Sequence, residues 1–198
     1  RIFKNKENKK RFIEKFSIIS TKRKRGKLIW FHGASVGEIM SIIPLIKNYE
    51  KNKLVSQILI TSSTLSSSKI LEKFKFNKTI HQFYPLDHFL FTSKFLRFWK
   101  PSIAIFIDSE IWPYMFKKIK DEKIPLVLLN ARLTKKTFKR WIMIKRTAKK
   151  VFSCFDLCLT SDNLTKDSLN KLGATNIKFI GNIKFAVPIN YKEIFNQN

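Results

Sequence analysis

Acidic residues are scarce in this chain of 198 residues. It holds 14 Asp and Glu against 40 Lys and Arg, which gives a formal net charge of +26. A positive charge of this size favours anionic partners, namely nucleic acid, acidic lipid or a phosphorylated substrate. A chain so rich in Lys, Ile, Asn and Phe is also typical of an A+T-rich genome, in which Lys accumulates on solvated faces. Charge alone therefore leaves both explanations open.

Cysteines and long apolar runs are also few. Cys154 and Cys158 lie four residues apart, with no second Cys or His pair to complete a metal site. We expect buried free thiols in a reducing cytoplasm. No run approaches the roughly 18 apolar residues that span a bilayer, and no signal peptide is visible. The chain starts at Arg1 without an initiator Met, so we interpret it as a fragment, which leaves open whether a membrane anchor precedes it.

The chain does contain a regular alternation of short apolar runs and stretches with helical periodicity. Residues 1–27 form a basic N-terminal segment with the cluster Lys22–Lys27 and with Phe12 and Phe16 on one face. Residues 28–182 alternate short apolar runs with stretches of helical period, and residues 183–198 follow them. The runs that predict strands are Leu28–Phe31, Gln57–Thr61, Thr79–Phe83, Ser102–Ile107, Leu126–Leu129, Leu157–Thr160 and Lys178–Ile180.

The stretches between these runs predict helices. Pro44 lies inside the first of them, so that helix should kink or start late. The longest, Thr134–Phe155, should be one helix with Lys and Arg on its outer face. Strand and helix alternation predicts an α/β fold, a Rossmann-like parallel sheet of six or seven strands with helices on both faces. The inner face of the longest helix should hold Trp141, Ile144, Ala148 and Val151.

Polar residues gather where the predicted strands end. In an open parallel sheet, ligands bind outside the carboxyl ends of the strands. Four of the 14 acidic residues fall there, and this concentration indicates a site at that rim. They are Glu38, Asp87, Asp108 and Glu110.

Glu38 has two interpretations. Gly33 and Gly37 allow a tight turn and a close approach to a ligand. Ser35 is a plausible N-cap with Glu38 three residues on, so the pair has the spacing of a capping box, in which Glu38 reaches back to the Ser35 N–H. The other interpretation is a general base, which needs hydrogen-bond reach of a hydroxyl and enough burial to offset the helix start, which lowers a pKa.

The other rim residues also leave alternatives open. Asp108 and Glu110 are candidates for binding a divalent metal, for orienting a substrate hydroxyl or amine, or for capping the helix that begins near Pro113. His32 adjoins the glycine turn and is a candidate for positioning a substrate. Arg132 suits a phosphate or a salt bridge to a rim carboxylate. The hydroxyl-rich stretch 61–68 suits a phosphate or a helix N-cap at Ser66.

Five segments, in this order, resemble the bacterial transferases of 3-deoxy-D-manno-octulosonic acid (Kdo). The first reads Ile-Trp-Phe-His-Gly-Ala-Ser-Val-Gly-Glu and the second Tyr-Pro-Leu-Asp. The third reads Ser-Glu-Ile-Trp-Pro, the fourth Asn-Ala-Arg-Leu and the fifth Gly-Asn-Ile-Lys-Phe. The chain departs from the family pattern at Asp108, Tyr114 and Ala186, where Glu, Asn and Asp are usual. The segments cover 29–38, 84–87, 109–113, 130–133 and 181–185.

The resemblance implies the N-terminal half of a GT-B glycosyltransferase that moves Kdo from CMP-Kdo to a lipid A precursor, lipid IVA, in lipopolysaccharide core biosynthesis. The acceptor would bind to this half and CMP-Kdo mainly to a second, missing domain, with residues 183–198 starting the connection. Glu38 would be the general base of an inverting reaction without a metal or another cofactor, supported by Glu110 and Asp108. The resemblance also implies substrate-binding roles for His32, Gly33, Ser35, Gly37, Asp87, Arg132, Asn182 and Lys184.

The implied place of work is the cytoplasmic face of the bacterial inner membrane, with an anionic membrane surface as partner and no nucleic acid. A different GT-B transferase that acts on a lipid-linked sugar is the nearest alternative, but it is not expected to carry these segments together. A basic nucleic-acid-binding module is the alternative from another class. A rim that bears carboxylates would repel a phosphate backbone, which argues against that module.

Overall fold

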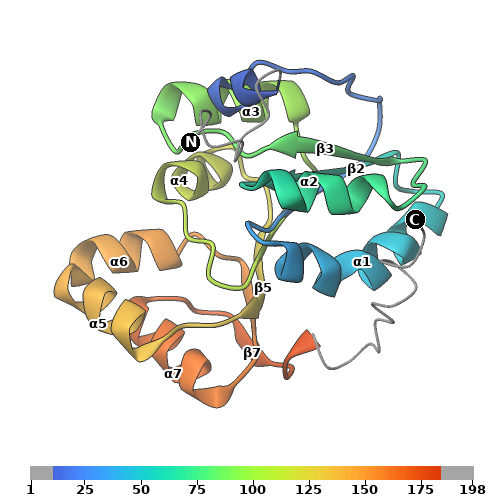
Figure 1. The fold of residues 1–198 in the computed structure, drawn as a ribbon. Coiled ribbons are helices and arrows are strands. Elements are labelled where there is room, and N and C mark those ends of the chain that lie inside the picture. Colours follow the sequence, from blue (N-terminus) through green and yellow to red (C-terminus); the bar gives the residue numbers. More distant parts are fainter. Residues whose placement is uncertain (1–10, 184–198) are drawn as a thin grey trace.

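The computed structural model describes residues 11–183. They form a seven-stranded sheet in the order β3-β2-β1-β4-β5-β6-β7, and every neighbouring pair is parallel (Figure 1). The chain therefore starts in the middle of the sheet, moves out to β3, and returns to the other side of β1. The strands are β1 (Leu28–His32), β2 (Gln57–Ser62), β3 (Thr79–Phe83), β4 (Ile103–Ile107), β5 (Leu126–Ala131), β6 (Leu157–Thr160) and β7 (Ile177–Phe179).

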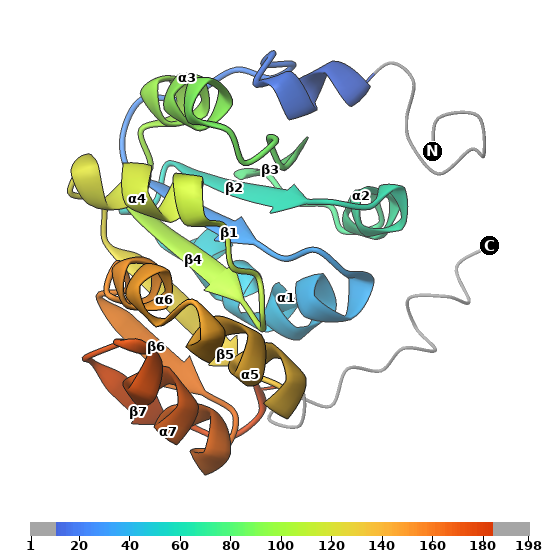
Figure 2. The ribbon, with the colours of Figure 1, turned by 90° about the vertical axis from the view of Figure 1, so that its left-hand side faces the viewer.

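The strands are apolar runs because both faces of the sheet are covered. In β1 every residue is buried, and alternate side chains enter the two separate apolar cores. One core lies under α1 and α2, and the other lies under α3 to α7 (Figure 2). The helices are α1 (Val36–Lys51), α2 (Leu65–Glu72), α3 (Phe89–Trp99), α4 (Pro113–Asp121), α5 (Lys135–Met143), α6 (Lys145–Phe152) and α7 (Asn163–Leu172). The predicted fold class is confirmed.

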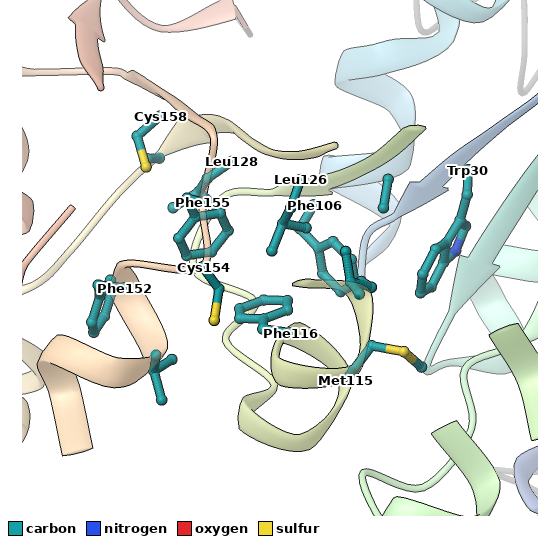
Figure 3. Packing of buried hydrophobic residues seen from close by; sticks show 14 of the residues in the cluster. Trp30, Phe106, Met115, Phe116, Leu126, Leu128, Phe152, Cys154, Phe155 and Cys158 are labelled. Carbon is teal, nitrogen blue, oxygen red and sulfur yellow. The ribbon is translucent and has the colours of Figure 1, made fainter. Parts of the chain in front are cut away.

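The larger core is held by a chain of aromatic rings (Figure 3). The ring of Phe106 meets those of Trp30 and Phe116 at centroid distances of 5.2 and 4.8 Å, and Phe116 meets Phe155 at 4.9 Å. Edge-to-face contacts of this kind add to the gain from burial. The two cysteines lie in this core as free thiols, as predicted, and burial raises the pKa of Cys158 to about 12.

The structure narrows one prediction about the first helices and corrects another. The helix α1 begins at Val36 and runs through Pro44, so of the two expected outcomes, a kink or a late start, the late start is wrong. The helix α2 is capped by Thr64, whose hydroxyl accepts from the N–H of Ser67, and not by Ser66. In both helices a hydroxyl residue in the short turn after the strand accepts one of the free N–H groups of the first helical turn.

The predicted long helix 134–155 is two helices. At Ile144 the backbone leaves helical geometry, with φ −113° and ψ 47°, and the side chain is 51% exposed instead of buried. In a straight helix, residues 141 and 152 would lie about 16 Å apart along the axis. The break brings the Trp141 ring against Phe152 at a centroid distance of 5.3 Å, so packing on the core overrides a continuous helix.

The described part of the basic N-terminal segment packs along the β3 side of the sheet. It contains a 3₁₀ helix, η2 (Phe12–Phe16), in which the two Phe rings contact each other, as the sequence predicts. Between them, Glu14 is fully buried. Its carboxylate accepts hydrogen bonds from Arg11, from the Ser20 hydroxyl and from the Phe83 N–H, which closes the end of β3.

Candidate active site

The strand order places a topological switch point between β1 and β4. Since the strands are parallel, the segments that follow them lie at one edge of the sheet. The turn after β1 carries Gly33 to Glu38, and the loop after β4 carries Asp108 and Glu110. These two loops are neighbours because β1 pairs directly with β4. Three of the four predicted rim carboxylates therefore meet at the switch point.

Glu38 sits in the first turn of α1, where it takes part in capping. Its Oε2 accepts a hydrogen bond of 2.7 Å from the Ala34 N–H, and its Oε1 accepts one of 2.8 Å from the Ser35 hydroxyl. The Glu38 N–H donates in return to the Ser35 Oγ. The capping arrangement exists, but the carboxylate reaches the Ala34 N–H and the Ser35 hydroxyl where the Ser35 N–H was expected.

Capping does not prevent Glu38 from being a stronger base than usual. Burial raises the pKa of Glu38, the hydrogen bonds from Ser35 and Ala34 oppose that rise, and the charges of Glu110 and Asp108 add to it. The net direction is upward from the ordinary value of 4.5. Partial burial therefore offsets the influence of the helix start, which is the condition that a general base needs here.

The glycine turn brings α1 close to the sheet. A Cβ built on Gly33 would lie 3.2 Å from the Glu38 Cβ and 3.3 Å from the Ile107 Cδ1, so a side chain would push the start of α1 away from β4. A Cβ on Gly37 would meet nothing within 4 Å. A side chain at position 33 would therefore need its neighbours to shift by a few tenths of an ångström, whereas the space beside Gly37 and the exposed Ser35 is open.

Glu110 is held by two rings. Its Oε2 lies 3.3 Å from the His32 Nε2 and accepts a 3.0 Å hydrogen bond from the Trp112 indole N–H. His32 is fully buried, and burial lowers its pKa although Glu110 and Thr61 act to raise it. The imidazole is therefore neutral at neutral pH.

A chain of donors orients this imidazole. The Trp30 indole N–H donates to the Thr61 Oγ1, which lies 3.0 Å from the His32 Nδ1. If the Thr61 hydroxyl donates to Nδ1, the neutral ring carries its proton on Nε2 and donates to the Glu110 carboxylate. Every donor then has an acceptor. His32 thus acts on the position of Glu110, behind the rim, and it is sealed off from solvent.

Tyr84 is a rim residue that begins the second family segment but was not among the predicted site residues. It follows β3 directly, and its ring contacts those of His32 and Trp112 in tilted arrangements at centroid distances of 4.0 and 4.8 Å. Its buried hydroxyl has no hydrogen-bond partner among the described residues. Burial raises its pKa well above 10, and the charges of Asp87 and Glu110 add to this. Its position immediately after a strand was the signal that could have found it.

Asp87 has a structural task at the same rim. Its Oδ1 accepts from the Met115 N–H at 2.8 Å and its Oδ2 from the Tyr114 N–H at 3.1 Å, so it caps α4 from another loop. Burial raises its pKa, and these two hydrogen bonds oppose the rise. The suggestion that Asp108 or Glu110 caps this helix is wrong, because Asp87 receives its first N–H groups.

Left-handed residues lie at the carboxyl ends of β4 and β5, Asp108 directly after β4 and Asn130 one residue before the end of β5. Asp108 has φ 64° and Asn130 has φ 55°. The Arg132 Nε lies 4.0 Å from the Asp108 Oδ1, at the limit of an ion pair, and its side chain is 52% exposed. Arg132 therefore keeps donors for other partners, and it lines a cavity of about 450 Å³ between α5 and α7.

The last segment of the site is tied to β5. Asn130 is fully buried, and its Oδ1 accepts from the Ile183 N–H at 3.1 Å, which fixes the chain beside the partly exposed Asn182. Asn130 was not among the predicted site residues. The predicted substrate contact Lys184 lies outside the described residues.

Residues 11–183 contain neither a candidate metal cluster nor a candidate membrane-spanning helix. In that part of the chain no three His, Cys, Asp or Glu side chains form a group that could hold a metal ion. None of its helices has the length and apolarity that crossing a bilayer requires.

Comparison with known proteins identifies the family to which this chain is similar. Residues 10–187 match the family model described as 3-deoxy-D-manno-octulosonic-acid transferase (kdotransferase). The 3-deoxy-D-manno-octulosonic acid transferase of Rickettsia felis is 38% identical over 170 residues, which cover 84% of this chain and 36% of that protein. The one of Rickettsia bellii is 36% identical over 197 residues, which cover 98% and 47%. The chain thus spans less than half the length of these curated relatives.

Solved structures of low identity share the fold. The UDP-GlcNAc 2-epimerase of Neisseria meningitidis matches 80% of this chain and 47% of its own with a TM-score of 0.55 and 14% identity. The complex of S. aureus MnaA with UDP matches 84% and 49% with a TM-score of 0.55 and 15% identity. With the parallel sheet, these matches support the N-terminal half of a GT-B fold. From the family match over most of its length, we conclude that this chain belongs to the 3-deoxy-D-manno-octulosonic acid transferase family.

Proposed function

We propose that this chain is the acceptor-binding half of an enzyme that transfers Kdo from CMP-Kdo to lipid IVA, a lipid A precursor, in lipopolysaccharide core biosynthesis. The family match supports a glycosyltransferase that uses Kdo, and the single observation that supports a catalytic site in this half is Glu38. It is a partly buried carboxylate with a raised pKa at the switch point of the sheet. A base placed there is at the edge where α/β proteins bind their ligands.

In the proposed reaction, Glu38 accepts the proton of an acceptor sugar hydroxyl as its oxygen attacks the anomeric carbon of Kdo. The new bond forms on the face opposite the bond to CMP, which breaks with its electron pair on the phosphate oxygen. CMP leaves, and the anomeric configuration inverts. No metal or other cofactor takes part in this proposal, and CMP-Kdo binds mainly to a second domain.

The other rim residues have supporting tasks in the proposal. Glu110 orients the acceptor, because His32 and Trp112 fix its carboxylate beside Glu38. Arg132, with Lys135 and Lys171 in the same cavity, suits a phosphate of the acceptor, although Asp162 and Asp167 also line it. The open space beside Gly37 leaves the backbone accessible to the substrate. We place the reaction at the cytoplasmic face of the inner membrane, where an anionic surface suits the charge of +26.

The test is Glu38→Gln in the full-length protein that carries this chain. Gln keeps the size and one acceptor oxygen but cannot take up the proton, so transfer from CMP-Kdo to lipid IVA should fall by about 10²–10⁴-fold. Thermal unfolding should stay unchanged within a few degrees, about the effect of 1 kcal/mol or less.

The matched control is Ser35→Ala. It removes the capping hydroxyl but leaves the carboxylate, so it should cost about 1 kcal/mol of stability with a small effect on transfer. If Glu38→Gln retains transfer within a few-fold, Glu38 is a helix cap and the proposed mechanism is wrong. Equal losses of transfer in both variants would assign the effect to capping.

A further inference from the structure

The hairpin of α5 and α6, residues 134–155, has charge of one sign. Its 22 residues include eight Lys and Arg and no Asp or Glu. All eight cations are exposed, and none belongs to an ion pair among the interactions of the described residues. The set is Lys135, Lys136, Lys139, Arg140, Lys145, Arg146, Lys149 and Lys150. Such a surface attracts anions and leaves its charge without an internal counterion.

The turn of this hairpin exposes two apolar side chains. Met143 is 83% exposed, more than any other large apolar side chain of residues 11–183, and Ile144 next to it is 51% exposed. The break at Ile144 causes this exposure, because it turns Trp141 toward Phe152 and leaves residues 143 and 144 outside the core. In Figure 1 the turn lies at the left-hand edge of the molecule, and Figure 2 looks onto α5 and α6.

Two exposed apolar side chains at the turn of a basic hairpin fit the interface of an anionic bilayer. Lys and Arg meet lipid phosphates in the headgroup layer, while flexible apolar side chains gain by entering the acyl boundary. A nucleic acid offers the same phosphates but nothing that would favour burying Met143 and Ile144. The combination therefore favours lipid over nucleic acid.

The hairpin also begins at the rim that holds the candidate active site. β5 ends at Ala131 and α5 starts at Lys135, so the first cations of the hairpin lie beside Arg132 and its cavity. A membrane bound along this hairpin would therefore border the rim. A lipid acceptor could reach the rim from the bilayer surface without leaving the headgroup layer.

We propose that the α5–α6 turn inserts Met143 and Ile144 into the headgroup layer of an anionic membrane, with the eight cations on lipid phosphates. It specifies how the membrane, a partner in the proposed function, is bound. Only the biological purpose of this binding rests on the proposed function.

The test is co-sedimentation of the 198-residue chain with vesicles of phosphatidylcholine, with and without an equal share of phosphatidylglycerol. Binding should require the anionic lipid and weaken with salt. Met143→Ser with Ile144→Ser should weaken partitioning at least about tenfold. The control is Leu54→Ser, because Leu54 is 71% exposed in the connection between α1 and β2 and should have no effect.

A second pair of variants tests the charge. Lys145→Glu with Arg146→Glu should weaken binding more than Lys51→Glu with Lys53→Glu, since both pairs change the net charge equally but only the first lies on the hairpin. Equal losses from the two pairs, or no loss from the Ser variants, would overturn the proposal in favour of diffuse attraction. Duplex DNA that displaces the chain from vesicles, with binding to DNA unchanged in the Ser variants, would favour a nucleic-acid surface. Sedimentation needs no donor or turnover, so its failure leaves the proposed transfer reaction untouched.

Discussion

The first turns of α1 and α4 are each capped by a carboxylate, and the two carboxylates look alike from the sequence. Glu38 and Asp87 both follow a strand of the parallel sheet, both are partly buried, and burial raises the pKa of both. They differ in what their oxygens contact. Both oxygens of Asp87 accept backbone N–H groups of α4, which lies 27 residues further along the chain. Glu38 accepts from its own turn and lies close enough to Glu110 and Asp108 to feel their charges.

This difference separates a carboxylate that anchors the fold from the carboxylate that we propose as the base. Asp87 joins the loop after β3 to the start of α4, because both of its carboxylate oxygens accept hydrogen bonds from the backbone of α4. Glu38 shares its surroundings with a second oriented carboxylate, Glu110, and with open space beside Gly37. A carboxylate at the rim is therefore not in itself a sign of catalysis, and the contacts of its two oxygens decide.

The largest effect on stability should come from Asp87→Ala. The variant leaves the N–H groups of Tyr114 and Met115 without an acceptor, and Met115 is fully buried. An unsatisfied buried donor costs about 1–3 kcal/mol, so the unfolding free energy in urea should fall by that amount. Asp87→Asn keeps one acceptor and should lose less. If Glu38→Gln destabilises the chain as much as Asp87→Ala, the two carboxylates have the same task and the comparison fails.

Much of the fold could be predicted because its signals are local. The strands are short apolar runs that the sheet buries, and the hydroxyl caps of α1 and α2 follow their strands within a few residues. The break at Ile144 could not be predicted, because it depends on the fit of Trp141 against Phe152 in three dimensions. The spacing of apolar residues along the sequence is the same whether the helix continues or breaks.

The candidate site was predicted as a rim, but not as a set of contacts. The rim at the carboxyl ends of the strands followed from the alternation of strands and helices, whereas the switch point depends on the strand order. The pairing of His32 with Glu110, 78 residues apart, and the capping of α4 by Asp87 depend on how distant loops meet. For the same reason the sequence could not separate the capping carboxylate from the candidate base.

A smaller effect should appear in the pH dependence of stability. Because the pKa of Glu38 is raised on folding, the native state binds more protons than the unfolded state between the ordinary value of 4.5 and the raised value. Stability contributed by Glu38 therefore falls as the pH rises through that window. Glu38→Gln should gain stability relative to the natural chain as the pH rises above 4.5. Urea unfolding over a series of pH values measures this difference.

Glu50, at the other end of α1, gives the opposite control. Burial acts to raise its pKa, but hydrogen bonds from the Thr79 hydroxyl and the N–H groups of Asn77 and Lys78 outweigh it and lower the pKa. Its contribution is present above the ordinary value of 4.5 and is lost as the pH falls through the lowered value. Glu50→Gln should therefore lose stability relative to the natural chain as the pH rises. Slopes of the same sign in the two variants would contradict both assignments.

The smallest effect should be that of Glu110→Gln on its neighbour. The charge of Glu110 helps to raise the pKa of Glu38, behind burial as the main cause, so removing that charge should lower the pKa of Glu38 by a modest amount. The amide oxygen of the substituted side chain can still accept from His32 and Trp112, which keeps that side chain in place. A carbon-13 NMR titration of the Glu38 carboxyl measures the shift, with Glu50→Gln as a control at the far end of α1. An upward shift, or an equal shift in the control, would mean that Glu38 and Glu110 do not form one electrostatic unit, and the contrast with Asp87 would lose its basis.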